Sequence, residues 1–348
     1  MKVFSSKRDS DSYSDNPKSK IENPKWVAEF ATLVIAFALC GAVGAQPTKI
    51  PRIGYVTASS RSTVQARVEA FQQGMRELGY VEDKNIAIEW RYGDGKPDRV
   101  PELVAELVRL KVDVIVTGGP STNRAAKDAT VTIPIVMAYD NDPVGNGFVA
   151  SLARPGGNIT GLSTLAPEIS GKQLELLKET VPQLSSVAVL GNSTNPGNAQ
   201  SLKELELAAR ALKLKLQYLD VKDPKDIETA FRAAAKGRAG AVLVLASSFF
   251  NSHRTQVIEL AVKGRLPAIY PYPEYMDDGG LMYYGTNYND LFRRAATFVD
   301  KIFKGRPPTE LPVEQPMKFE FIVNLKAAKA IGLTVPPNVL VRATRVIR

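Results

Sequence analysis

Small hydroxyl, amide and glycine residues follow several of the apolar runs in this sequence. The most suggestive segment is "GGPST" (118–122), which comes directly after the apolar run 112–116 and directly before a helix-like stretch, 122–130. A glycine turn that opens a helix presents backbone N–H groups, which favour a carboxylate or a phosphate. The turn therefore predicts an anion-binding site, with simple capping of the helix start as the alternative interpretation.

The residues needed for most enzyme chemistry are missing. "GGPSTN" has neither the G-x-G-x-x-G spacing of a dinucleotide site nor the Gly-Lys-Ser/Thr of a P-loop. His253 is the single histidine, Cys40 is the single cysteine, and no G-x-S-x-G occurs. We therefore expect no catalytic residue, no metal site and no cofactor, and a binding protein rather than an enzyme.

An enzyme remains an alternative because carboxylates follow several of the apolar runs. They are Asp140, Asp142, Glu274, Asp277 and Asp278. A pair of them could serve as acid and base, although nothing in their spacing selects a pair.

The charge balance is basic, with a formal net charge of +9 over 348 residues. The lysines and arginines are spread along helix-like stretches without a run of five, and no nucleic-acid-binding motif is present. We interpret the charge as solvated helix faces and expect no nucleic-acid partner. The length exceeds that of one ordinary domain, so two lobes are expected.

The first 45 residues resemble a targeting segment rather than part of the fold. The stretch 30–45 carries no charge, follows three lysines, and ends with Val43 and Ala45 at the spacing preferred by signal peptidase. We predict a cleaved signal peptide over 1–45 with a long polar front end. The mature protein would then be periplasmic or otherwise extracytoplasmic. A retained membrane anchor is the alternative.

Two series of alternating strands and helices follow. Strands are expected at 52–56, 85–93, 112–119 and 133–139, and helices at 64–80, 99–112 and 122–130. In the second series, strands are expected at 186–192, 214–221, 240–248 and 266–272, and helices at 168–180, 197–212, 224–236 and 252–263. Such alternation is typical of parallel sheets covered by helices.

Three extended segments link the two series. They lie at 158–164, 279–288 and 311–324, and the last two are followed by helices at 289–305 and 325–333. The predicted fold class is α/β, with two doubly wound parallel-sheet lobes joined by a three-segment hinge. Lobe 1 would comprise 50–160 plus 287–312, and lobe 2 would comprise 163–284 plus 318–348.

Ligands bind at the carboxyl ends of the strands in open parallel sheets. The segments at these ends are 57–63, 118–122, 139–145, 191–198, 247–252 and 270–275. Ser121 or Thr122, and Ser193 or Asn195, are expected to cap helices. Five tyrosines near the end of the second series could stack on a planar ligand or simply pack between strands; they are Tyr270, Tyr272, Tyr275, Tyr283 and Tyr284.

Several longer motifs resemble a known family. "DVIVTGG" (113–119), "SLARPGGNITG" (151–161) and "AAKAIGLTVPPNVLVRA" (327–343) are similar to segments of the ABC transporter substrate-binding proteins, which include tryptophan- and tyrosine-binding members. The similarity extends over nearly the whole chain after residue 50. It implies a type I periplasmic-binding-protein-like fold and delivery of a small molecule to a membrane permease driven by a separate ATPase.

The resemblance also implies which residues hold the ligand between the lobes. By position these are Thr57, Ala58, Gly119, Pro120, Ser121, Thr122, Tyr139, Asn141, Asp142, Asn192, Ser193, Ser247, Tyr270, Tyr272 and Pro273. We expect a small carboxylate-bearing ligand, an amino acid or another aromatic or apolar acid, captured by hinge closure in a monomeric protein. The turn 119–122 would take the carboxylate, and Asp140 or Asp142 an ammonium. An extracytoplasmic sensor domain is a further alternative.

Overall fold

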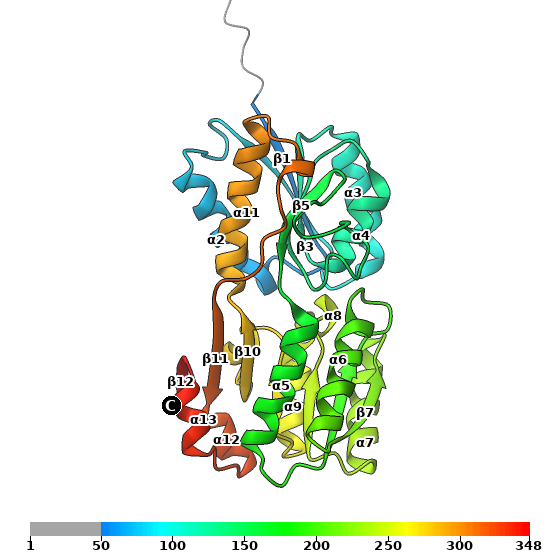
Figure 1. Ribbon diagram of the computed structural model, residues 1–348, viewed down its shortest axis with the longest axis vertical. Coiled ribbons are helices and arrows are strands. Elements are labelled where there is room, and N and C mark those ends of the chain that lie inside the picture. Colours follow the sequence, from blue (N-terminus) through cyan, green and yellow to red (C-terminus); the bar gives the residue numbers. More distant parts are fainter. Residues whose placement is uncertain (1–49) are drawn as a thin grey trace, which may run out of the picture. The chain divides into compact units, whose positions relative to one another are not determined.

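The computed structural model describes residues 50–348, which form one compact unit. The predicted signal peptide, 1–45, lies outside the described residues. Two sheets with covering helices make up the unit (Figure 1). Within residues 50–348, no helix combines the length and the apolar character needed to cross a membrane.

The first sheet has five parallel strands in the order β2-β1-β3-β4-β5. They are β1 (Arg52–Thr57), β2 (Ala87–Tyr92), β3 (Val114–Gly118), β4 (Ile135–Asp140) and β5 (Ile159–Ser163). β3, β4 and β5 are buried along their whole length, which explains their continuous apolar runs.

Helices cover both faces of this sheet. α2 (Gln65–Glu77) and α11 (Tyr288–Phe303) pack together on one face, and α3 (Val100–Arg109) and α4 (Pro120–Ala129) on the other (Figure 1). Short 3₁₀ turns, η1 (Ser62–Val64), η2 (Pro97–Arg99) and η3 (Pro308–Glu310), complete this lobe. α11 belongs to the first sheet in space, although it follows most of the second sheet in sequence.

The second sheet has seven strands in the order β12-β11-β10-β9-β8-β6-β7, and only the β10–β11 pair is antiparallel. The strands are β6 (Ser186–Gly191), β7 (Lys215–Asp220), β8 (Ala241–Val244), β9 (Ala268–Tyr270), β10 (Met282–Thr286), β11 (Phe319–Asn324) and β12 (Arg345–Ile347). Its helices are α5 (Ala166–Thr180), α6 (Asn198–Ala211), α7 (Pro224–Lys236), α8 (Ser248–Ser252), α9 (Arg254–Lys263), α10 (Glu274–Asp277), α12 (Leu325–Ile331) and α13 (Pro337–Arg342).

Strand β6, which lies between β8 and the edge strand β7, shows how the second sheet is covered on both faces. Val187 and Val189 lie in a core cluster with residues of α5 and α6, whereas Ala188 and Leu190 lie in another with residues of α7 and α9. Successive side chains of a strand point to opposite faces, so a strand buried on both sides is apolar throughout.

Three chain segments connect the lobes, as predicted. The chain passes from β5 to α5, returns from β10 to α11, and passes again from η3 to β11. Two of these segments are tied together where the Thr286 hydroxyl donates to the Thr164 carbonyl at 3.2 Å. The predicted α/β fold of two lobes with a three-segment hinge is confirmed.

Some predicted element boundaries were wrong. The helix expected at 252–263 begins two residues later as α9, and a separate short helix, α8, precedes it and ends at Ser252. The strand expected at 266–272 is only β9 (Ala268–Tyr270), because Pro267 and Pro271 on either side of it cannot donate to a ladder.

Candidate functional site

The carboxyl ends of the two sheets meet along a line of contacts that we call the interlobe seam. A Cβ added at Gly197, after β6, would lie 3.1 Å from the Asn141 Cβ, after β4. A Cβ added at Gly95 would lie 2.9 Å from the Ser252 Cβ of α8. The strand-end segments that the sequence selected in the two lobes therefore include residues that face one another.

A buried ion pair crosses the seam. Arg67 of α2 is only 2% exposed, and it donates through Nε to Glu274 Oε1 at 2.7 Å and through Nη2 to Glu274 Oε2 at 2.8 Å. Such a two-bond fork is the strong geometry for an arginine–carboxylate pair. Burial acts to lower the pKa of Arg67, but the Glu274 carboxylate more than offsets this, so its pKa is raised and the guanidinium stays charged.

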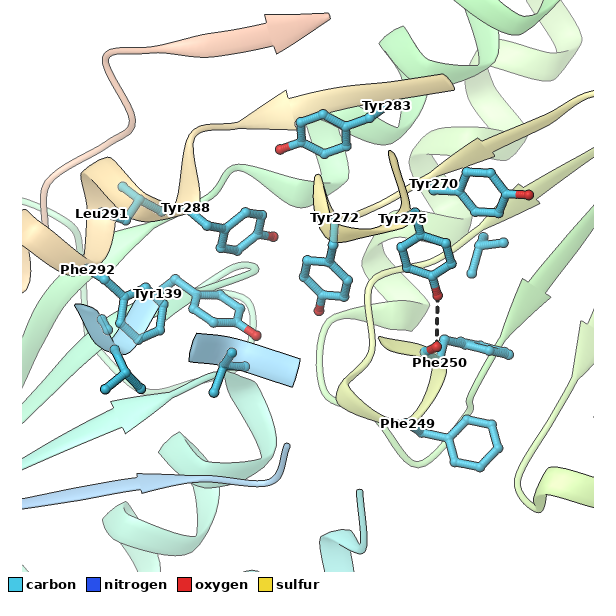
Figure 2. Close-up of a cluster of buried hydrophobic side chains, with 14 of the residues drawn as sticks. Tyr139, Phe249, Phe250, Tyr270, Tyr272, Tyr275, Tyr283, Tyr288, Leu291 and Phe292 are labelled. Atoms are coloured by element: carbon cyan, nitrogen blue, oxygen red, sulfur yellow. Dashed lines mark hydrogen bonds between the residues drawn. The ribbon is translucent and has the colours of Figure 1, made fainter. Parts of the chain in front are cut away.

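Three tyrosine rings surround this guanidinium. Its central carbon lies 4.4 Å from the ring centre of Tyr288, 4.9 Å from that of Tyr272 and 5.9 Å from that of Tyr139. The three rings converge in Figure 2, and the Tyr139 and Tyr288 rings meet edge to face at 5.0 Å. Burial raises the pKa of all three hydroxyls, which keeps them neutral beside the cation.

The other tyrosines of the predicted group pack within the second lobe. Tyr270 and Tyr275 stack with ring centres 4.5 Å apart, and the Tyr275 hydroxyl donates to the Phe250 carbonyl at 2.9 Å (Figure 2). The Tyr283 hydroxyl donates to the Thr286 carbonyl at 2.6 Å, and Tyr284 stacks on Phe319. Packing between strands and helices therefore accounts for Tyr270, Tyr275, Tyr283 and Tyr284. Of the five predicted tyrosines, only Tyr272 lies against the Arg67 guanidinium.

Asp140 organises the loop after β4. Its Oδ1 accepts from the Asp142 N–H at 2.9 Å and from Asn146 Nδ2 at 2.8 Å, while Oδ2 accepts from Asn123 Nδ2 at 2.5 Å. Burial raises the pKa of Asp140 to about 7, although these hydrogen bonds oppose the rise. Its carboxylate is occupied by protein donors, which argues against the expected role of binding an ammonium.

Asp142 is likewise engaged, because its Oδ1 accepts from the Gly145 N–H at 2.8 Å. The neighbouring Asn141 is different. It is 1% exposed, and within residues 50–348 neither its Nδ2 nor its Oδ1 has a hydrogen-bond partner. A buried amide without partners costs about 1–3 kcal/mol, so this side chain is suited to a molecule that enters the seam.

Two long helices begin at the seam without a side-chain cap. The N-cap of α4 is Gly119 (φ 124°) and that of α6 is Gly197 (φ 83°). The predicted caps were therefore wrong: the Thr122 hydroxyl instead donates to the Gly119 carbonyl at 2.7 Å, and the Ser193 N–H and hydroxyl both bond Asp220. At the start of each of these two helices, no side chain accepts a hydrogen bond from the backbone N–H groups.

A recess of about 480 Å³ lies on the seam beside the start of α6. The first lobe contributes Arg124, Gly145 and Asn146 to its wall, and the second contributes the segment 193–200 with Leu202 and Tyr218. Arg124 donates through Nη2 to the Asn146 carbonyl at 2.6 Å and lies 4.7 Å from the Phe148 ring centre.

The remaining predicted residues lie in the strand-end loops but use their side chains within the protein. Thr57 Oγ1 accepts from the Ser59 N–H, Asn192 Oδ1 accepts from Thr194, and Ser247 caps α8 by accepting from the Phe249 N–H. Ala58 is fully buried, Ser121 is half-buried, and Pro120 and Pro273 stand at the starts of α4 and α10.

Sequence reasoning missed Arg67, Asn123, Arg124 and Asn146. A signal for Arg67 was present, because it lies three residues after Val64 and four before Phe71, on the apolar face of its helix. A charged residue there must be buried or paired. We find no comparable signal for Asn123, Arg124 or Asn146, whose roles depend on distant partners.

A family model described as "ABC transporter substrate binding protein" matches residues 53–347. A curated relative, the "Tyrosine-binding protein" of Clostridioides difficile (strain R20291), is 24% identical over 265 residues, which is 76% of each chain. A conserved domain protein from Vibrio cholerae has a similar structure, with a TM-score of 0.81 and 28% identity over 86% of this chain and 100% of that one.

A second solved structure, an ABC domain from Streptococcus pneumonia in complex with L-Trp, has a TM-score of 0.80 and 24% identity over 85% of this chain and 99% of that one. These similarities agree with the two-lobed fold. The chain belongs to the family of ABC transporter substrate binding proteins.

Proposed function

We propose that this protein binds a small carboxylate-bearing amino acid, with an aromatic or apolar side chain, between its two lobes. The observation that supports this most directly is Asn141, a buried amide at the seam with a donor and an acceptor that lack protein partners. One amide of this kind matches both ends of a zwitterion, since Nδ2 donates to a carboxylate and Oδ1 accepts from an ammonium.

Other buried polar atoms strengthen the case for a ligand. Among the described residues, the Tyr55 hydroxyl and Asn251 Oδ1 are also buried without partners. The ligand class comes from relatives, one of which is named for tyrosine and another of which was solved with L-Trp. Of the fifteen residues implied by the resemblance, all but Tyr270, which packs within the second lobe, form the proposed wall, with the turn 119–122 on one side and the segment 192–193 on the other.

Capture would proceed by hinge closure. The ligand would contact both lobes only when they are together, so it would stabilise the closed arrangement by those differential contacts. The protein would act outside the cytoplasm after cleavage of its signal peptide, as a monomer, and would deliver its ligand to a membrane permease for import.

The test is thermal unfolding of the purified protein with a panel of L-tyrosine, L-tryptophan, L-phenylalanine and L-leucine. A ligand at a hundred times its Kd should add about 2.7 kcal/mol to the free energy of unfolding. We expect Asn141→Ala to remove most of this gain. Asn289→Ala, which changes an exposed asparagine of α11, is the matched control and should keep it. A panel without any shift in the wild-type protein would refute the proposed ligand class.

A further inference from the structure

We propose that the recess beside the start of α6 is the carboxylate subsite of this protein, formed by Arg124 from one lobe and the α6 N-terminus from the other. This inference rests on the proposed function for the identity of the whole ligand. It differs from the expectation drawn from the sequence, which assigned the carboxylate to the turn 119–122.

Charge is the first reason. In the part of the chain that the structure describes, no carboxylate lies within ion-pair distance of Arg124, which contacts the Asn146 carbonyl and the Phe148 ring. A guanidinium can bind two carboxylate oxygens with parallel N–H bonds, and Arg124 is only half-buried at the wall of an open recess. It is therefore placed to pair with an incoming anion.

The start of α6 is the second reason. This helix has 14 residues, no side-chain cap and no acidic residue in its first turn. Its first-turn N–H groups and its dipole both favour an anion at this end. At α4, in contrast, Pro120 occupies the first helical position and contributes no N–H.

Asn141 gives an independent observation next to the N-cap of α6, although it does not itself line the recess. Its Nδ2 would lie 3.6 Å from a Cβ built on Gly197, the N-cap of α6. The side chain is 1% exposed and has an unpartnered donor. A carboxylate between Arg124 and the start of α6 would supply the acceptor that this amide lacks.

Closure completes the subsite, because its two halves belong to different lobes. Gly197 suits this contact, since its backbone has φ 83° and a Cβ added there would lie 3.1 Å from the Asn141 Cβ and 3.5 Å from Asn146 Nδ2. A carboxylate would therefore be fully bound only with the lobes together, which links recognition of the charge to the closing movement.

The test compares L-tyrosine with tyramine, which lacks the carboxylate, by isothermal titration calorimetry. Arg124→Gln removes the guanidinium, and Gln200→Glu places a carboxylate in the first turn of α6, at the wall of the recess. Both variants should weaken the binding of L-tyrosine about 10- to 100-fold, because a hydrogen bond to a charged group usually contributes a free energy of that size. The affinity for tyramine should stay unchanged. Gln200→Glu should not lower the melting temperature, because an acidic residue suits a helix start.

Two matched controls separate the subsite from general charge effects. Lys127→Gln removes a positive charge one turn further along α4, and Leu207→Glu adds a negative charge two turns along α6 at a half-exposed position. Neither should change the L-tyrosine affinity more than twofold. Equal effects of the controls and the test variants would overturn the proposal.

A titration with acetate tests the carboxylate subsite without assuming that L-tyrosine is the ligand. Titrated alone, it should shift the NMR signals of the Asn141 side-chain amide and the Gly197 N–H in the wild-type protein but not in Arg124→Gln. Acetate shifts without any amino-acid binding would support the subsite and refute the proposed ligand. L-tyrosine binding that is insensitive to Arg124→Gln and to Gln200→Glu would refute the subsite and leave the proposed function intact.

Discussion

At the scale of single residues, Asp140 shows how burial and hydrogen bonding compete. Three donors stabilise its charged form, yet complete burial raises its pKa to about 7 from the usual value of 3.8. Between about pH 4 and pH 7 the folded protein therefore holds a proton that the unfolded chain has released. The free energy of unfolding should fall as pH rises through this window, because the native state then binds more protons.

The variant Asp140→Asn tests whether the free energy of unfolding falls with rising pH because of this carboxyl group. The variant keeps the shape of the side chain but cannot ionise, so its free energy of unfolding should fall less between pH 5 and pH 8 than that of the wild type. One pKa unit is equivalent to about 1.4 kcal/mol, so the difference should exceed ~1 kcal/mol in urea unfolding. Identical pH dependence in the two proteins would contradict the raised pKa.

The residue scale also shows what the sequence could and could not indicate. Asn141 was among the residues implied by the family resemblance, but nothing local distinguished it from Asp142, whose carboxylate is used within the loop. The caps at 121–122 and at 193 or 195 were predicted from residue type. They failed because the backbone there has a positive φ, which assigns the N-cap to Gly119 and Gly197.

At the scale of elements, the contact between α2 and α11 depends on a glycine. A Cβ added at Gly74 would lie 2.4 Å from the Arg293 carbonyl oxygen and 2.9 Å from the Ala296 Cβ. The two helices could not approach as closely with any other residue at this position. Gly171 of α5 has more room, since a Cβ there would lie 3.7 Å from the Ala208 Cβ.

These two helical glycines form a matched pair. Gly74→Ala should destabilise the protein by about 1–3 kcal/mol, as overpacking usually does. Gly171→Ala should stabilise it by up to about 1 kcal/mol, because alanine is the better helix former. Melting temperatures followed by circular dichroism would show opposite shifts, and a loss of stability in both variants would contradict the difference in space.

The elements themselves were largely predictable because their signals are local. Helical spacing of Val64, Val68 and Phe71 located α2, and unbroken apolar runs located the central strands. β12 (Arg345–Ile347) was not predicted, since a strand of three residues shows no period of its own. The partner of α2 could not be read from the sequence, because α11 begins more than two hundred residues later.

At the scale of the whole molecule, the Arg67–Glu274 pair joins the two lobes. Glu274→Gln would leave a buried guanidinium without its counter-charge in the closed arrangement, a change that typically costs about 3–5 kcal/mol. We expect the lobes of this variant to separate without ligand and its radius of gyration in solution scattering to increase. The double variant Arg67→Met, Glu274→Gln removes the uncompensated charge and should return toward the wild-type scattering curve. Unchanged scattering of Glu274→Gln would show that the pair does not hold the lobes together.

The position of α11 also affects how this molecule can fold. The strands β6 to β10 are made between β5 and the helix that covers the first sheet. A growing chain that has completed all five strands of that sheet must still expose the part of one apolar face that α2 leaves uncovered until residues 288–303 appear. Contacts this distant in sequence raise the contact order and slow folding. If the protein is exported as proposed, this delay would keep the chain available for translocation before its N-terminal lobe becomes stable.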